Sequence, residues 1–268
     1  MDLASKVAAG GYRGLVTFSD IHAHADKLKK GIRYAIKNDL FIVFLGDLVD
    51  GHDKPLETVL TVKALLDEDR AVFVIGNHDD KFYRYAKGNK VVLKGANKKT
   101  LEDVPEDKRD LFLKTISDVV THQNSALTHR LHNWTFVHGA AHRTVWDDRD
   151  NLQKRAKHRA LYGQSSGKME PLGWRKLLPA AIRDTDKDFP VREYDWVDEI
   201  PADQNVVVGH DRKPMGKKLK KSGPHTHAGA LGGKAVFTDM GCGKGGKLCL
   251  AIFSVDGDNV EMTGHEAI

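Results

Sequence analysis

Short apolar runs, each followed at once by polar residues, mark the first third of the chain. The runs at 14–19, 41–45 and 71–75 are rich in β-branched and aromatic residues, which is typical of buried strands. Between them, segments 26–38 and 55–69 place apolar residues on one helical stripe. Strands and helices that alternate with connections of this length predict βαβ units, and therefore an α/β fold with helices flanking a sheet.

The pattern changes in the middle of the chain. Within 80–130, apolar residues recur at helical spacing among many charges, which predicts a helical insertion before a strand at 134–137. Residues 141–200 have poor periodicity and several Pro and Gly, so we expect an irregular lid over the site. We expect residues 1–268 to form a single domain.

Regular apolar runs return near the C-terminus. Their composition is typical of strands, and we expect them to belong to a second sheet. They lie at 205–208, 234–238, 248–253 and 259–262.

The composition is that of a globular protein, with 40% apolar and 29% charged residues in 268. No stretch approaches the roughly 20 continuous apolar residues that a membrane span needs, so no membrane partner is expected. Two cysteines are too few for a disulfide framework or a thiolate zinc site. We expect a cytoplasmic protein, encoded by a bacterium or a phage, with no obligate protein partner.

The net charge of +5 mildly favours anionic partners. A basic run follows Gly209-His210, and it is either a solvated loop or a strip that contacts a phosphate backbone. The run consists of Arg212, Lys213, Lys217, Lys218, Lys220 and Lys221.

Polar residues at the ends of the predicted strands carry the candidate chemistry. Open α/β sheets bind their ligands at the carboxyl ends of strands, so these residues are expected to converge. Their oxygen and imidazole groups suit two adjacent divalent metal ions. In chain order, the candidate metal ligands are Asp20, His22, Asp47, Asn77, His138 and His210.

Each ligand taken singly has a structural alternative. Asp20 or Asp47 could cap the helix that follows it, and His138 or His210 alone could be a hydrogen-bonded structural histidine. Six such residues at strand ends are better explained together by metal ligation. Asn77 is the most informative, because a neutral amide between glycine and histidine suits a metal ligand better than a core.

Such a site supports hydrolysis of phosphate esters. Two ions held roughly 3.5–4 Å apart bind the phosphoryl oxygens and lower the pKa of a bridging water, which provides a hydroxide for in-line attack. His78, beside Asn77 but not needed for coordination, is the predicted general acid for the leaving oxygen. Asp79 is expected to orient the His78 ring. Asp50 could orient another ligand, or simply cap a turn or a helix.

These motifs resemble those of the metallophosphoesterase superfamily, also called calcineurin-like phosphoesterases. Asp20-Ile-His22, Gly46-Asp-Leu-Val-Asp50 and Gly76-Asn-His-Asp79 match its first three motifs in order, and His138 and Gly209-His210 match the last two. The resemblance implies a β-sandwich flanked by helices. It also implies two divalent ions, with manganese expected and iron, zinc or nickel as the other metals used.

Within the superfamily, roughly residues 14–255 look most like the phosphatase domain of bacterial polynucleotide kinase/phosphatase. That likeness implies that Asp239 lies at the active site. The segments of this chain that carry the likeness are Gly76–Arg84, Lys87–Asn89, Arg159–Gly163, Thr238–Cys242 and Gly245–Leu248.

One position departs from the pattern. In that branch and in protein Ser/Thr phosphatases, the second motif continues Asp-Arg-Gly, and the arginine grips the substrate phosphate. Here Asp50 is followed by Gly51-His52, so another cation must bind the phosphate. The sequence offers four candidates and does not choose among His52, Lys81, Arg84 and Arg143.

The leading hypothesis is a phosphohydrolase acting on nucleotides or on RNA or DNA ends, as phosphomonoesters, 2′,3′-cyclic phosphates or phosphodiesters. The alternative is a protein Ser/Thr phosphatase or a dinucleoside tetraphosphate hydrolase. A third hypothesis is a non-catalytic metal-binding scaffold that docks a partner. The presence of His78 argues against the scaffold, since such proteins usually lack the catalytic histidine.

Overall fold

The computed structural model describes residues 3–143, 154–170, 189–212 and 223–268. Its helices are α1 (Leu3–Ala9), α2 (Ala25–Lys37), α3 (Pro55–Asp67), α4 (Asn77–Ala86), α5 (Ala96–Asp103), α6 (Arg109–Val120) and α8 (Lys154–Tyr162). Its strands are β1 (Gly14–Phe18), β2 (Leu40–Phe44), β3 (Ala71–Val74), β4 (Ser125–Ala126), β5 (Thr128–Leu131), β6 (Trp134–Val137), β7 (Ser165–Glu170), β8 (Phe189–Arg192), β9 (Asn205–Val208), β10 (His225–Ala228), β11 (Lys234–Phe237), β12 (Cys249–Asp256) and β13 (Asn259–Ala267). Short 3₁₀ helices span Glu106–Lys108, Asp195–Glu199 and Cys242–Lys244.

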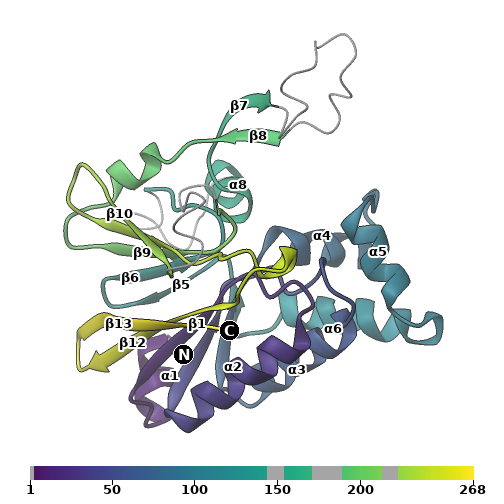
Figure 1. The fold of residues 1–268 in the computed structure, drawn as a ribbon, viewed down its shortest axis with the longest axis horizontal. Coiled ribbons are helices and arrows are strands. Elements are labelled where there is room, and N and C mark those ends of the chain that lie inside the picture. Colours follow the sequence, from purple (N-terminus) through teal and green to yellow (C-terminus); the bar gives the residue numbers. More distant parts are fainter. Residues whose placement is uncertain (1–2, 144–153, 171–188, 213–222) are drawn as a thin grey trace.

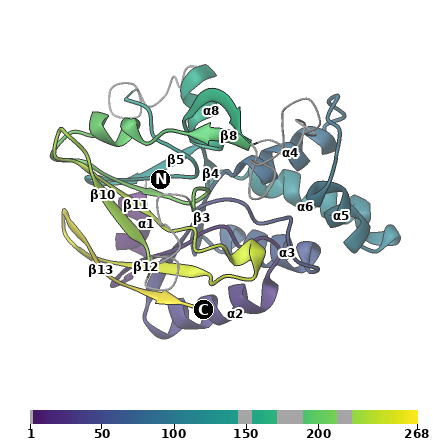
Figure 2. The same cartoon turned by 45° about the horizontal axis from the view of Figure 1, so that its top comes forward.

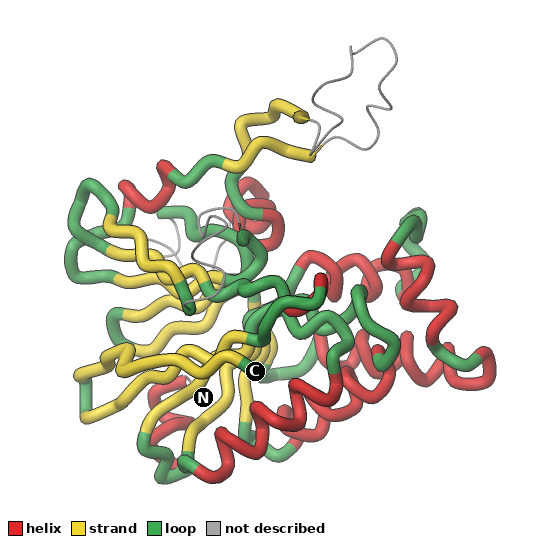
Figure 3. The backbone as a smooth tube through the Cα atoms, viewed as in Figure 1, coloured by secondary structure: helices red, strands yellow, loops and turns green. Residues whose placement is uncertain are grey.

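Two large sheets face each other, and helices α2, α3 and α6 cover the outer face of the first (Figures 1 and 3). The first sheet has the order β13-β12-β1-β2-β3-β4, in which β1 to β4 run parallel. The second has the order β10-β11-β9-β6-β5, in which β11, β9 and β6 run parallel. Strands β7 and β8 form a small separate sheet that projects from the molecule (Figure 1).

The central strands are buried on both faces, which explains their continuous apolar runs. In β2, Ile42 and Phe44 pack against the helices, whereas Phe41 and Val43 pack against the second sheet. A further apolar cluster, which includes Trp196, lies against the second sheet's strands β9 and β11. The α/β prediction with flanking helices is confirmed.

The predicted helical insertion is also present, as α4, α5 and α6, which gather on one side of the molecule, away from β10 and β13 (Figure 2). The strands β4 and β5 occupy the end of the predicted insertion, between 125 and 131. The expectation of a single domain for residues 1–268 stays a prediction. In the part of the chain that the structure describes, no helix has the length and apolar content needed to cross a membrane.

One strand assignment was wrong. The runs at 248–253 and 259–262 form β12 and β13, which join the first sheet rather than the second. The antiparallel pairing of β12 with β1 places Phe253 opposite Leu15. An apolar run predicts a buried strand but does not specify its partner, because any unpaired strand edge offers the same backbone donors and acceptors.

The region expected to be an irregular lid contains α8, β7, β8 and the 3₁₀ helix Asp195–Glu199. Trp146 and Trp174, which belong to this region, lie outside the described residues. The backbone N–H groups of Gly139 and Ala140 donate to carbonyls of α8 at 2.6 and 3.0 Å, so α8 is tied to the segment that follows β6.

A half-buried histidine links the two sheets. The Nε2 atom of His129 on β5 lies 3.1 Å from the Phe73 carbonyl oxygen on β3, to which it can donate. Burial lowers the pKa of His129 from 6.5 to about 4, although backbone contacts partly oppose this shift. Between these pH values the unfolded chain binds a proton at this position and the folded chain does not.

We therefore expect the free energy of unfolding to fall as the pH drops from about 6.5 to about 4, by up to ~1.4 kcal/mol per pH unit from this group. Urea denaturation at pH 7, 6 and 5 measures this slope. The variant His129→Gln keeps a side-chain donor but cannot titrate, so its slope should be shallower. Equal slopes in the two proteins would contradict this contribution.

Candidate metal centre

The structure brings the six predicted ligands together at the carboxyl ends of parallel strands. Strands β1, β2 and β3 deliver their residues from the first sheet, and β6 and β9 deliver theirs from the second. The order along the chain is Asp20 and His22 after β1, Asp47 after β2, Asn77 after β3, His138 after β6 and His210 after β9.

The backbone turns sharply at four of these residues. Asp20, His22, Asp47 and His210 have φ values of 51°, 51°, 53° and 57°, in the left-handed region that residues other than glycine rarely adopt. Such conformations cost on the order of 1–3 kcal/mol each and persist where the surrounding structure enforces them. The backbone strain therefore lies just after the strands, at residues whose side chains point toward the candidate metal site.

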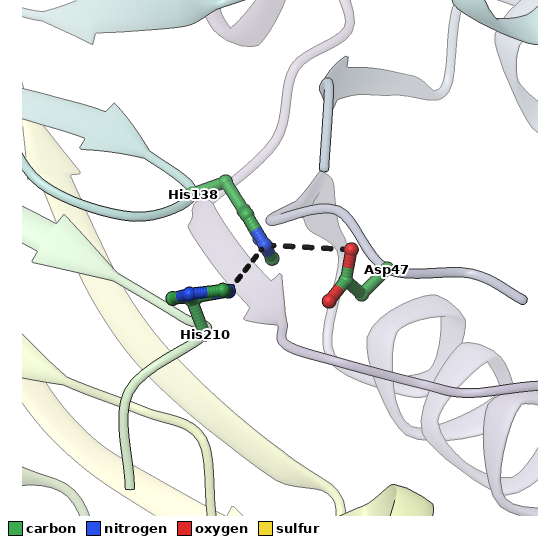
Figure 4. Close-up of side chains that lie close together, drawn as sticks. All are labelled: Asp47, His138 and His210. Atoms are coloured by element: carbon green, nitrogen blue, oxygen red, sulfur yellow. Dashed lines mark hydrogen bonds and ion pairs between the residues drawn. The ribbon is translucent and has the colours of Figure 1, made fainter. Parts of the chain in front are cut away.

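Asp47 lies at the centre of the site. Among the described residues, two groups of three side chains have potential ligand atoms within 4.8 Å of one another, and both groups contain Asp47. One consists of Asp20, His22 and Asp47, and the other of Asp47, His138 and His210. The His138 Nε2 atom lies 3.4 Å from Asp47 Oδ1 and 3.2 Å from His210 Nδ1 (Figure 4).

His22 and Asn77 also lie close to this group of side chains. The second carboxylate oxygen of Asp47, Oδ2, lies 4.0 Å from His22 Nε2. The Asn77 Oδ1 atom lies 3.1 Å from His138 Nε2, so the amide oxygen also faces this group. One carboxylate thus presents its two oxygens to two different sets of ligands.

The electrostatics of the cluster suit cations. Burial alone would raise the pKa of Asp47, but His138 and His78 hold it well below its ordinary value. Burial and the nearby Asp47 raise the pKa of Asp20, and burial and Asp20 raise the pKa of Asp239. Buried carboxylates this close oppose one another's charge, and divalent cations would remove that repulsion. The mixed oxygen and imidazole donors therefore fit two divalent ions.

Backbone carbonyls orient two of the histidines. The Nδ1 atom of His22 lies 3.0 Å from the Val49 carbonyl oxygen, and that of His138 lies 2.6 Å from the Leu45 carbonyl oxygen. A carbonyl can only accept, so each Nδ1 donates and each Nε2 faces the cluster. This is the usual way in which proteins orient metal-ligating imidazoles.

Asp79 does not have the contact that the sequence suggested. Its carboxylate accepts hydrogen bonds from the backbone N–H groups of Asp47 at 2.7 Å, Leu48 at 3.0 Å and Gly76 at 3.2 Å. Burial and the nearby Asp47 raise its pKa to about 7. Asp79 therefore ties together the loops that carry the second and third motifs.

Asp50 is the residue that contacts the predicted general acid. Its carboxylate hydrogen-bonds to His78 Nδ1, and it accepts further hydrogen bonds from Asn97 and Thr100 of α5. Burial disfavours the charged form of His78, but Asp47 and Asp50 raise its pKa to about 9. Sequence reasoning missed Asn97 and Thr100, because they lie about 50 positions from Asp50 and belong to no motif.

A cavity of about 590 Å³ opens over the cluster. Four of the metal candidates line it, together with Asp50, His78 and Asp239; these four are Asp20, His22, Asp47 and His210. Asp239 follows β11, as the resemblance implied, and its Oδ1 atom accepts a hydrogen bond of 2.7 Å from the Gly241 N–H.

Two arginines outside the four candidates for the phosphate-binding cation also line this cavity, and one of them, Arg212, begins the basic run noted in the sequence. Arg192, from β8, lies with its Nη2 atom 2.8 Å from His210 Nε2 and donates to the Tyr162 carbonyl. Arg212 lies with its Nε atom 3.7 Å from Asp239 Oδ2. Arg192 lies in the region of poor periodicity, so no sequence pattern identified it.

The four cations proposed from the sequence are not among the lining residues of this cavity in the described part of the chain. His52 packs on His24, with ring centroids 4.1 Å apart, and Lys81 hydrogen-bonds to Asn97. Arg84 pairs with Asp80 at 2.8 Å. Arg143 is exposed, and the lysines of the basic run, from Lys213 to Lys221, lie outside the described residues.

Comparison with known proteins agrees with this geometry. Residues 15–232 match the family described as calcineurin-like phosphoesterase. The chain belongs to this family. Its members are metal-dependent phosphoesterases, so the predicted enzyme class is confirmed, while the identity of the metal remains a matter for proposal.

Several relatives within this calcineurin-like family are bis(5′-nucleosyl)-tetraphosphatases. The PrpE protein of Bacillus subtilis is 29% identical over 217 residues, which cover 76% of this chain and 81% of PrpE. The PrpE protein of Anoxybacillus flavithermus is 27% identical over 230 residues, which cover 82% of this chain and 81% of its own length. These relatives correct the resemblance to the polynucleotide branch and favour the alternative named from the sequence.

Solved calcineurin-like structures support the fold. A protein proposed to be a diadenosine tetraphosphatase has a TM-score of 0.55 at 18% identity, covering 95% of this chain and 94% of its own. A protein serine/threonine phosphatase from Saccharomyces cerevisiae has a TM-score of 0.54 at 13% identity, covering 94% and 78%.

The shared position of Asp47 predicts that its removal affects both metals. Wild-type protein incubated with Mn²⁺ and desalted should retain two ions per chain, measured by mass spectrometry of the metal content. Asp47→Ala should retain fewer than one, because each group of ligands loses a member. Lys37→Gln, an exposed change on α2, is the matched control. Retention of two ions by Asp47→Ala would contradict the assignment.

Proposed function

We propose that this protein is a binuclear-metal phosphohydrolase that cleaves dinucleoside tetraphosphates asymmetrically. The observation that carries the proposal is the position of Asp47, shared between two ligand groups beneath a cavity. The relatives named as bis(5′-nucleosyl)-tetraphosphatases indicate the substrate class. Hydrolysis of nucleic-acid ends, the leading hypothesis from the sequence, is the competing outcome of the substrate test.

The six strand-end residues would hold the two ions, with Asp47 as the shared ligand. We expect manganese, as the family resemblance implied, with iron, zinc or nickel as the alternatives that the three imidazoles also suit. Two such ions would supply Lewis-acid stabilisation of the phosphoryl oxygens and an activated water. The chain's own side chains would protonate the leaving oxygen and bind the substrate phosphate.

We assign the protonation of the leaving oxygen to His78. Its Nδ1 atom is engaged by Asp50, so Nε2 is the atom that faces the cavity, 3.8 Å from Asp47 Oδ2. Asp50 in turn is fixed by Asn97 and Thr100. A ring whose orientation is fixed from behind can deliver its proton without first reorganising.

Arg192 is the cation that we assign to the substrate phosphate. It lines the cavity beside His210, and its planar guanidinium can grip two phosphate oxygens at once. It would take the role of the arginine that Gly51 replaces. Because it comes from β8 and not from the second motif, it would approach the phosphate from a different direction.

A substrate panel with Mn²⁺ tests the proposed function. We expect kcat/KM for diadenosine tetraphosphate to exceed that for a 5′-phosphorylated oligonucleotide and for a phosphoserine peptide by at least about tenfold. The products, separated by anion exchange, should be a nucleoside triphosphate and a nucleoside monophosphate. Preference for the oligonucleotide would favour the nucleic-acid hypothesis, and preference for the phosphopeptide would favour a protein phosphatase.

Replacement of His78 tests the general acid. His78→Ala should reduce kcat for diadenosine tetraphosphate by about 10²–10⁴-fold, the usual contribution of such a group. The loss should be much smaller for p-nitrophenyl phosphate, because nitrophenolate leaves without a proton. The ratio of the two losses is the measurement, since a disturbed metal site would lower both rates equally. Equal losses would therefore contradict the role.

A further inference from the structure

A second cavity, of about 600 Å³, adjoins the cavity over the metal ligands. It is lined by Arg212, Met240 and residues of the glycine- and lysine-rich segment 241–247. Arg212, Gly241 and Lys244 line both cavities, so the two lie side by side. Lys247 lines only the second one.

The second cavity is strongly basic. Among the described residues that line it, Arg212, Lys244 and Lys247 are cations, and none is a carboxylate. Both lysines are exposed to solvent. Asp239 lies behind Arg212, with 3.7 Å between the carboxylate and the guanidinium, and it lines the first cavity only.

The segment 241–247 has a compact shape maintained by its own backbone. Gly241 has a φ of 80°, and a Cβ atom there would lie 2.7 Å from Arg212 Nη1, so glycine permits the guanidinium to lie against the chain. The N–H groups of Lys244 and Gly246 donate to the Gly241 carbonyl, both at 2.9 Å. These two backbone N–H groups are engaged in hydrogen bonds within the loop. The cationic side chains that line the cavity are the groups that we consider for binding an anion.

We propose that this second cavity binds the phosphates of a nucleoside oligophosphate that lie beyond the bond being cleaved. We call it the distal phosphate subsite, defined by Arg212, Lys244 and Lys247. The proposal rests on the proposed function, which places the reacting phosphate at the metal ligands. Phosphates joined by single oxygens carry dense charge along a short path, and three cations beside the cavity over the metal candidates match that charge.

The lining favours an oligophosphate over a nucleic-acid strand. Sites for single-stranded nucleic acid combine a basic groove with aromatic side chains on which bases stack. Within the described chain, no aromatic side chain lines the second cavity. The phosphate chain of an oligophosphate carries no bases between its phosphates, so it can be bound by cations alone.

Lys247→Gln tests the subsite, because Lys247 lines only the second cavity. With free Mn²⁺ held constant, kcat/KM is measured for diadenosine tetraphosphate and for p-nitrophenyl phosphate, which has no distal phosphates. The ratio of the two values should fall about fivefold, the effect of one exposed ionic contact. Arg192→Gln, by contrast, should lower both values, since both substrates present the reacting phosphate. Lys37→Gln should change neither value.

A competition experiment measures the same subsite without the dinucleotide. Inorganic tripolyphosphate and orthophosphate are compared as inhibitors of p-nitrophenyl phosphate hydrolysis, again at constant free Mn²⁺. Lys247→Gln should raise the inhibition constant of tripolyphosphate about fivefold more than that of orthophosphate. This result supports the subsite even if the wild-type protein fails to cleave diadenosine tetraphosphate, an outcome that would refute only the proposed function.

An unchanged inhibition constant for tripolyphosphate in Lys247→Gln would overturn the distal phosphate subsite. If a 5′-phosphorylated oligonucleotide at the same time inhibits that variant more weakly than the wild type, the lysine is a nucleic-acid contact. Thermal unfolding of each variant verifies that the exchanged side chain has not altered the fold.

Discussion

The buried carboxylate of Asp47 is the interaction on which the site depends. Its oxygens face His138 on one side and His22 on the other, and its own backbone N–H is held by Asp79. A carboxylate in this position requires strand ends from both sheets to meet within a few ångströms. The left-handed backbone at Asp20, Asp47 and His210 is the conformational cost of that meeting.

The helical insertion takes part in this arrangement. Helix α5 contributes Asn97 and Thr100 to the carboxylate of Asp50, and Asp50 contacts His78. A carboxylate with so many partners has little freedom to rotate, and neither has the imidazole that it holds. The insertion therefore stabilises the position of the proposed acid from outside the two sheets, and its first helix, α4, begins at the metal candidate Asn77.

The sequence was most informative where structure is local. The strands, and the convergence of strand-end residues such as Asp20 and Asp47, could be predicted because burial imposes apolar runs and sheet topology brings the polar strand ends together. The strand pairing of β12, the contact of Asp50 with His78 and the position of Arg192 depend on residues far apart in the chain. No single-sequence pattern encodes such contacts, so these features required the three-dimensional structure.

The absence of arginine after Asp50 has a steric explanation that connects the two cavities. Gly51 has a φ of 111°, and a Cβ atom there would lie 3.0 Å from the Gly243 carbonyl oxygen and 3.1 Å from the His22 Cβ atom. The segment 241–247 thus approaches the backbone where a larger side chain would begin. The same approach brings Lys244 to the cavity over the metal ligands. A larger side chain at position 51 and the present path of the segment 241–247 would therefore compete for the same space.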